Sequence, residues 1–372
     1  TVLLDSIVTI KYNTNGVQQW IAHYIGPKKT LSPDIQLVVD DSGYIYISGE
    51  TLDTAITITP RQDYITIRYN SLGTVLWETT YNGVPYGDDK PKAIAIDNKG
   101  NVYVTGESDD TSNYYSDYAT IKYNSNGQEQ WVARYNGSAD FHDTPYAIVL
   151  DKFGNIYITG TTYDIGICNG SCRNFTTIKY DSIGTEQWIA RYDGPDNGWD
   201  EAYAIIIDTT GNIFITGPSV ETGWDYTTIK YDKDGNEAWV ARYNGGVTYA
   251  IDLDNNGNVY VTGRTSNGDI ATIKYNLTVG IFEINEATNL NVSIYPNPIT
   301  NSAILYIKNL PLSFKKASLI FYLYNLLGEK VKQIEIYNEK AKFYRNNLPI
   351  GIYFYKLQIK DKIIAAGKII IN

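Results

Sequence analysis

The sequence predicts an all-β protein with two domains, a β-propeller of four-stranded blades followed by a small Ig-like β-sandwich. Three observations lead to this prediction. A β-rich unit recurs through residues 1–280, its short strands alternate apolar and polar residues, and both the repeat and the sign of the net charge change near residue 281. Four-stranded units repeated at a fixed period are typical of propellers.

Five tryptophans mark the repeating unit. They lie 57, 54, 57 and 51 residues apart, and a hairpin phrase such as "IDNKGNVYVTGES" (residues 96–108) occurs once between each tryptophan and the next. A blade buries its faces only against its neighbours, so we expect these side chains to pack between blades. The repeat tryptophans are Trp20, Trp77, Trp131, Trp188 and Trp239.

Each unit contains four strands, named a to d here and typified by "KAIAID", "NVYVTG", "YATIKYN" and "EQWVARY". Glycine-containing turns join a to b and c to d, because glycine tolerates the positive φ of a tight turn. The strands alternate in direction, so these turns share one side of the propeller, the hairpin face. The b–c and d–a loops share the other side, the variable face.

The number of blades depends on how the incomplete units at the two ends are used. The propeller starts just before a c strand and ends just after another. The N-terminal c and d strands could complete the unit at 248–264 and close five blades, or they could belong to a separate blade. We expect six blades, within a range of five to seven.

The stretches Asp89–Gly106 and Asp200–Gly217 resemble the bacterial SBBP-type β-propeller repeat. The resemblance covers nearly all of residues 1–280 and implies the fold. It implies no activity, because propellers carry many unrelated functions.

Residues 281–372 hold 12 Lys+Arg and 6 Asp+Glu, which leaves 19 and 35 for residues 1–280 and net charges of +6 and −16. A body this acidic repels phosphate backbones, so we expect no nucleic-acid partner. No apolar run is long enough to span a bilayer, so no integral membrane segment is expected.

The last part of the chain contains about seven short β runs, which predict a small sandwich. Its phrases "VSIYPNPIT", "YNLLGEKV", "LPIGIYFYK" and "GKIIIN" closely resemble the C-terminal sorting domain of the type IX (Por) secretion system. The chain ends at Asn372, where many members of that family end with lysine. The matching positions are Pro296, Asn297, Pro298, Gly328, Gly351 and Gly367.

The resemblance implies export across an outer membrane, recognition of residues 290–372 by the type IX translocon, and a secreted or cell-surface location. Residues 281–289 would then form a linker, and a cleavage site is expected near this break in composition. For an extracellular protein, Cys168 and Cys172 predict a local disulfide. They lack the four-ligand set of a structural zinc site.

Catalytic motifs are scarce. His23 and His142 are the only histidines, and neither G-x-S-x-G nor H-E-x-x-H occurs. We therefore expect a non-enzymatic protein. The alternative is a glycosidase or lyase that uses paired carboxylates on the variable face: Asp109, Asp110, Asp196, Asp200, Glu201 and Glu221.

Aromatic residues in the variable-face loops favour binding or adhesion. Their flat apolar rings, beside amides and carboxylates, suit sugars or peptide side chains of an extracellular glycan or protein. The alternative is that the rings cover the loop bases. A third hypothesis is a self-assembling structural subunit. The candidate ligand-binding residues are Trp199, Trp224, Tyr86, Tyr114, Tyr115, Phe141 and His142.

No cofactor is expected, and calcium is the one metal that the sequence brings into question. Asp89, Asp143 and Asp200 each precede an a strand and could form a cation ring at the channel mouth, or each could cap its own turn. The phrase "DLDNNGN" at 252–258 matches the first half of an EF-hand loop, but Gly263 replaces the bidentate glutamate. Turn geometry is the simpler interpretation.

Overall fold

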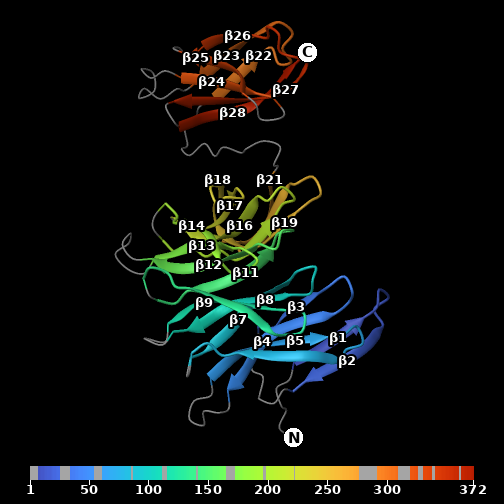
Figure 1. The fold of residues 1–372 in the computed structure, drawn as a ribbon. Helices are drawn as coiled ribbons and strands as arrows, with labels where there is room; N and C mark the ends of the chain where they lie inside the picture. Colours follow the sequence, from blue (N-terminus) through green and yellow to red (C-terminus); the bar gives the residue numbers. More distant parts are fainter. Residues whose placement is uncertain are drawn as a thin grey trace. The chain divides into compact units, whose positions relative to one another are not determined.

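The protein is described here from a computed structural model, which divides into two units, Thr1–Lys274 and Tyr275–Asn372 (Figure 1). All elements in the described part of the chain are β-strands, as predicted. No helix in that part is long and apolar enough to cross a membrane. The structure describes residues 7–25, 34–53, 61–84, 87–110, 115–139, 141–164, 172–195, 198–221, 223–275, 291–308, 319–325, 330–336, 340–359 and 362–372.

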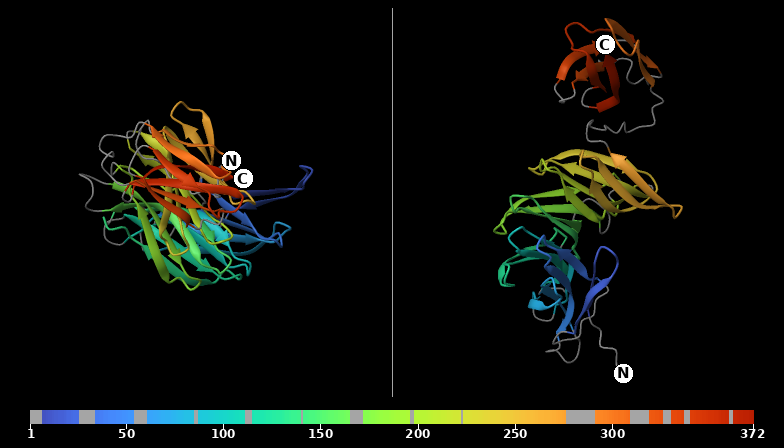
Figure 2. Two further views of the ribbon diagram at one scale, coloured as in Figure 1. Left: turned by 90° about the horizontal axis from the view of Figure 1, so that it is seen from above. Right: turned by 90° about the vertical axis from the view of Figure 1, so that its right-hand side faces the viewer.

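The first unit contains six antiparallel sheets that follow one another in chain order (Figures 1 and 2). The four complete sheets have the predicted order a-b-c-d. Their strands, in chain order, are β3 (Gln36–Val39), β4 (Ile45–Asp53), β5 (Arg61–Tyr69) and β6 (Val75–Tyr81); β7 (Asp89–Ile96), β8 (Val102–Asp109), β9 (Ser116–Tyr123) and β10 (Glu129–Tyr135); β11 (Thr144–Leu150), β12 (Ile156–Asp164), β13 (Cys172–Tyr180) and β14 (Glu186–Tyr192); β15 (Ala204–Ile207), β16 (Ile213–Val220), β17 (Trp224–Tyr231) and β18 (Glu237–Tyr243).

The end sheets are incomplete among the described residues. The first pairs β1 (Ile7–Tyr12) with β2 (Gln18–Tyr24), and the last contains β19 (Gly246–Leu253), β20 (Val259–Thr265) and β21 (Ile270–Tyr275). The N-terminal pair therefore does not complete the sheet of β19 and β20, which pairs with β21 instead. The number of blades stays a prediction.

Burial on both faces explains the composition of the inner sheets. Val104 and Ile121 are fully buried, and the hydroxyls of Thr105 and Thr120 hydrogen-bond to each other at 2.9 Å. The first sheet is covered on one face only, so Val8 and Ile10 are 45% and 41% exposed. Similar c-strand sequences are thus buried on both faces where sheets flank them and on one face only in the first sheet.

Each a–b hairpin is closed by an aspartate. In the hairpin at Asp97, Oδ1 accepts the backbone N–H groups of Lys99 and Asn101, both at 2.9 Å, and Oδ2 accepts the Asn101 side chain and the Tyr103 hydroxyl. Gly100 has φ +76°, as the turn requires. The equivalent aspartates at the other hairpins are Asp40, Asp151, Asp208 and Asp254.

A tryptophan–glycine contact joins neighbouring sheets at four junctions, so four of the five repeat tryptophans pack between sheets as expected. The Trp77 indole N–H donates to the carbonyl of Ser125 at 3.0 Å, in the next sheet's c–d turn. The Trp77 ring lies against Gly127, where a Cβ would stand 2.7 Å from a ring carbon. The same contact joins Trp20 to Gly73, Trp131 to Gly184 and Trp188 to Gly235.

The second unit consists of two sheets around one core. One sheet has the order β22 (Asn291–Tyr295), β23 (Ser302–Lys308) and β26 (Lys340–Tyr344). The other has the order β25 (Lys330–Ile336), β24 (Leu319–Tyr324), β27 (Gly351–Ile359) and β28 (Lys362–Ile371). Buried residues of both sheets, including Phe321, Phe343 and Leu357, form the core. The Ig-like class of this sandwich stays a prediction.

The proline-rich motif of this unit lies along the last strand. Asn297 Oδ1 accepts the Ile370 N–H at 2.8 Å, and the Ile299 N–H donates to the Ile370 carbonyl at 2.7 Å. Gly367 has no room for a side chain, because a Cβ would lie 2.7 Å from the Tyr355 ring. Gly328 and the predicted linker 281–289 lie outside the described residues.

Candidate binding site on the variable face

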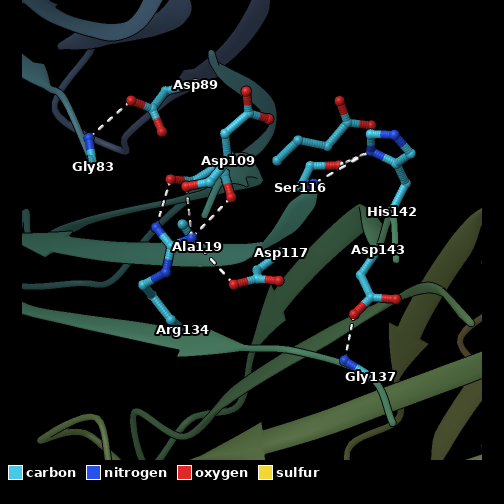
Figure 3. Close-up of polar contacts among 12 residues, drawn as sticks. Gly83, Asp89, Asp109, Ser116, Asp117, Ala119, Arg134, Gly137, His142 and Asp143 are labelled. Carbon is cyan, nitrogen blue, oxygen red and sulfur yellow. Dashed lines mark hydrogen bonds and ion pairs between the residues drawn. The ribbon is translucent and has the colours of Figure 1, made fainter. Parts of the chain in front are cut away.

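Three of the predicted binding residues pack together on the variable face. Tyr115 lies 4.5 Å from Phe141 and 4.9 Å from His142 between ring centroids. The Nδ1 atom of His142 stands 3.1 Å from the hydroxyl oxygen of Ser116 (Figure 3). These rings contact one another and His142 is exposed, and their binding of a ligand stays a prediction. Tyr86 and Tyr114 lie outside the described residues.

The aromatic array continues across the next two sheets. Phe141 contacts Tyr163 at 4.9 Å between centroids, and the Tyr163 hydroxyl accepts a hydrogen bond from Arg173 Nε at 2.6 Å. The Arg173 guanidinium lies 4.6 Å from the centroid of Trp199, a favourable cation–π distance. Trp199 is therefore held by Arg173 on one side while half of its surface stays exposed.

The second predicted tryptophan, Trp224, lines a separate pocket of about 600 Å³. Trp224 is 37% exposed and Tyr249 is 55% exposed, so two aromatic side chains offer free surface there. Tyr249 stacks on Tyr203 with an interplanar angle of 3°. The lining residues are Gly223, Trp224, Asp225, Asn244, Gly245, Gly246, Val247, Tyr249, Arg264, Thr265 and Ser266.

This pocket lies beside an unusually short d–a loop. Only residues 244–245 separate β18 from β19, whereas residues 82–88 separate β6 from β7. The short loop shortens the interval from the repeat tryptophan to the glycine of the next b strand, which is 24 residues from Trp239 to Gly263 but 29 residues from Trp188 to Gly217. That shorter interval was the available sequence signal for the pocket, and Tyr249 and Arg264 were not predicted as site residues.

Arginines of strand d link the variable-face ends of neighbouring sheets. Arg242 donates to the Tyr192 hydroxyl of the preceding sheet at 3.1 Å and lies 3.3 Å from an oxygen of Asp225. Arg134 makes the equivalent contacts: it donates to the Tyr81 hydroxyl at 3.4 Å. It also lies 3.2 Å from an oxygen of Asp117 (Figure 3). These pairs fix the strand ends from which the loops depart.

The hydrogen bonds of the three aspartates considered for a cation ring favour the second alternative, in which each carboxylate caps its own turn. The side chains of Asp89, Asp143 and Asp200 are fully buried. Asp89 accepts the Gly83 N–H at 2.8 Å, and Asp143 accepts the Gly137 N–H (Figure 3). Asp200 likewise accepts the N–H of the glycine six residues before it, at 2.6 Å. Each carboxylate closes its own d–a loop because its nearest donor is the amide that the same loop brings back.

Burial has a strong effect on the protonation of these aspartates. Desolvation raises the pKa of Asp89 to about 6 and that of Asp143 to about 7, against the opposing effect of the loop N–H groups. It also raises the pKa of Asp200. These carboxyl groups hold the loops of the variable face by hydrogen bonds, and burial destabilises their ionised form.

The EF-hand-like phrase forms an ordinary a–b hairpin. Asp254 Oδ1 accepts the N–H groups of Asn256 and Asn258, both at 2.9 Å, and Oδ2 accepts the Tyr260 hydroxyl at 3.0 Å. Within the described residues, no three His, Cys, Asp or Glu side chains gather as metal ligands would. The calcium hypothesis gains no support from this geometry.

The carboxylates considered for catalysis have structural partners. Asp109 accepts the Asp88 N–H at 2.9 Å, and burial raises its pKa. Glu201 pairs with Arg173 and accepts the Tyr203 hydroxyl, while Glu221 lies 3.7 Å from Arg242. Asp196 lies outside the described residues, and Asp110 N–H donates to the Tyr115 carbonyl.

Cys172 is buried and disulfide-bonded, in agreement with the predicted disulfide. The other cysteine of the chain, Cys168, lies outside the described residues.

Comparison with family models identifies both parts of the chain. Residues 79–114 and 130–165 match the β-propeller repeat, and residues 293–372 match the secretion system C-terminal sorting domain. The chain is thus a β-propeller repeat protein with a type IX sorting domain. A sorting domain of this kind indicates export by type IX secretion to the cell surface or outer membrane.

Solved structures resemble the chain only distantly. PorZ, a surface component of the type IX secretion system of Porphyromonas gingivalis, is 12% identical with a TM-score of 0.37, covering 93% of this chain and 52% of PorZ. An ulvan lyase is 10% identical with a TM-score of 0.35, covering 89% and 79%. Sucrose-6-phosphate hydrolase from Lactobacillus gasseri is 9% identical with a TM-score of 0.34, covering 92% and 86%. Likenesses this low carry no argument about function. A search of curated proteins found no match.

Proposed function

We propose that this chain is a non-enzymatic binding protein of the cell surface and that it binds an extracellular saccharide through its variable face. The observation that carries the proposal is the open pocket beside Trp224. Its volume of about 600 Å³ falls within the range of small-ligand sites.

The composition of the pocket favours a sugar. Trp224 and Tyr249 present ring surface on which the apolar face of a sugar ring can lie. Asn244 and Ser266 are exposed at its edge and offer hydrogen bonds to hydroxyl groups. The stack between Tyr249 and Tyr203 holds one wall in place, which lowers the entropy lost on binding.

The interactions of the carboxylate in the pocket lining favour binding over hydrolysis. Asp225 is the one carboxylate of the pocket lining, and it pairs with Arg242 and accepts the Gly245 N–H. A glycosidase needs a pair of carboxyl groups facing the same sugar, one of them available as a proton donor. The engaged Asp225 does not supply that arrangement.

The test is a glycan array probed with the full chain and with a Trp224→Ala variant. We expect the wild type to bind a defined set of saccharides and the variant to lose most of that signal. Phe153→Ala is the matched control. Phe153 is 76% exposed and lines the other described pocket, of about 530 Å³ on the hairpin face. A wild type that binds no saccharide would contradict the proposal, as would equal binding by wild type and Trp224→Ala.

A further inference from the structure

The pocket exists because one position in the repeat has changed from a buried carboxyl group to glycine. Asp89 pairs with Ser108 across the a and b strands, and Gly246 pairs with Thr265 at the equivalent position of the last sheet. Asp89 anchors a seven-residue loop (82–88), whereas the loop before Gly246 is two residues long. Without the aspartate and the loop that it holds, the end of the last sheet stays open.

A second change puts a positive charge at the same opening. Arg264 follows the glycine of its b strand, the position occupied by Glu50, Glu107, Thr161 and Pro218 in the other sheets. The strand pairing confirms the equivalence, since Val247 pairs with Arg264 as Lys90 pairs with Glu107. The last sheet therefore carries arginine where two other sheets carry glutamate.

The Arg264 guanidinium is exposed and forms no ion pair with any described residue. Arginines elsewhere on this face differ, since Arg134 pairs with Asp117 and Arg173 pairs with Glu201. The acidic residue of the pocket lining is Asp225, and it already forms an ion pair with Arg242 at 3.3 Å. Arg264 is thus the charged side chain of the pocket lining that forms no ion pair with a described residue.

We propose that the pocket selects saccharides in which the bound sugar carries a carboxylate, as in a uronic acid. The sugar ring lies on Trp224 and Tyr249, and Arg264 binds the carboxylate through its paired N–H donors. Guanidinium groups match carboxylates in geometry, and such charge-assisted hydrogen bonds are stronger than neutral ones.

The net charge of the surrounding protein further restricts the class of saccharide that we expect to bind. Residues 1–280 carry 19 basic and 35 acidic side chains, a net charge of −16, which opposes the approach of a continuous polyanion. We therefore expect an isolated acidic sugar flanked by neutral ones. This inference rests on the proposed saccharide binding, and its test distinguishes the failure of one from the failure of the other.

The test is calorimetric titration of the full chain with oligosaccharides of one backbone that differ at a single sugar, either glucuronic acid or glucose. A third ligand carries a sulfate ester on that glucose. We expect the wild type to prefer the glucuronic acid form about tenfold or more, the range of a charge-assisted hydrogen bond. Arg264→Gln should bind both forms within about twofold of each other, the level that the neutral contacts alone support.

Two variants complete the design. Arg264→Lys keeps the charge but not the paired donors, so it should retain part of the preference. Lys152→Gln removes one positive charge from the hairpin face and should leave the preference unchanged. Equal wild-type binding of the glucose and glucuronic acid forms would overturn this inference and leave saccharide binding intact. Preference for the sulfated form would overturn the carboxylate assignment, and no binding of any ligand would overturn both proposals.

Discussion

The indole ring of Trp77 lies directly against the α-carbon of Gly127 in the next sheet, so close that a methyl group at Gly127 would stand 2.7 Å from the ring. The indole N–H of Trp77 also donates to the Ser125 carbonyl two residues earlier. The c–d turn thus serves two purposes, reversing its own chain and receiving a side chain of the preceding sheet.

Gly127→Ala should destabilise the first unit by about 2–4 kcal/mol, because alanine is strained at φ +78° and its methyl group displaces the Trp77 ring. Unfolding by urea, followed by tryptophan fluorescence, measures this loss. Gly16→Ala is the matched control. Gly16 has φ +76° but nothing within 4 Å of its Cβ position, so only backbone strain of about 1–2 kcal/mol is expected. Equal losses for the two variants would show that the tryptophan contact contributes nothing.

Stability should depend on pH through Asp143. Its pKa is about 7 in the folded protein, against an ordinary value of 3.8, because of burial. The stabilising contribution of the protonated group is therefore complete below about pH 4 and is lost as the pH rises through 7. Relative to Asp143→Asn, the wild type should lose on the order of 4 kcal/mol between pH 4 and pH 8.

Urea unfolding of both proteins at several pH values measures this difference. Asp41→Asn, at an exposed position in the first a–b hairpin, is the control and should shift little relative to the wild type. A constant difference between wild type and Asp143→Asn across this pH range would be incompatible with a raised pKa at Asp143.

Asp97→Ala should weaken one a–b hairpin. The carboxylate accepts two backbone and two side-chain hydrogen bonds within its own turn. Loss of these bonds leaves amide groups without acceptors, at an expected cost of about 1–3 kcal/mol. Amide hydrogen exchange at Lys99 and Asn101 should accelerate in the variant. Lys99→Ala changes the same turn without removing an acceptor, and faster exchange at Asn101 in that control would argue against the role given to Asp97.

Asn297→Ala should loosen the last strand of the sorting domain. Asn297 accepts the Ile370 N–H at 2.8 Å, while the neighbouring bond from the Ile299 N–H to the Ile370 carbonyl is retained. Exchange of the Ile370 amide should therefore become faster at a cost of about 1 kcal/mol. Exchange at Leu357, inside the sheet core, should not change. An unaltered Ile370 amide would show that Asn297 does not hold the strand.

The repeat architecture could be predicted because its chemistry is local in sequence. The hydrogen bonds of each a–b hairpin aspartate are made within seven residues, with an asparagine in four of the five hairpins, and the repeat tryptophan recurs at a nearly constant interval. The arrangement at Asp89, Asp143 and Asp200 is local for the same reason. Their positions are equivalent, but each finds its donor six residues back in its own loop rather than in the other two aspartates.

The candidate site could be predicted only in part. Trp224 was identified because an aromatic side chain in a loop is visible in the sequence. Arg264 was not, since it becomes unusual only when strand pairing shows that it occupies the position of Glu107. The pocket depends on the spacing of three loops that meet in space, and sequence patterns within each loop do not contain that information.

The uniform tryptophan–glycine contact also has a consequence for how such a molecule changes over generations. Four successive junctions between sheets use the same tryptophan–glycine contact, so duplication or loss of one of these units creates no new kind of junction. The pocket beside Trp224, by contrast, lies at a loop shortened at a single place. The number of repeats can therefore change while the pocket stays the same, and the pocket can change while the number of repeats stays the same.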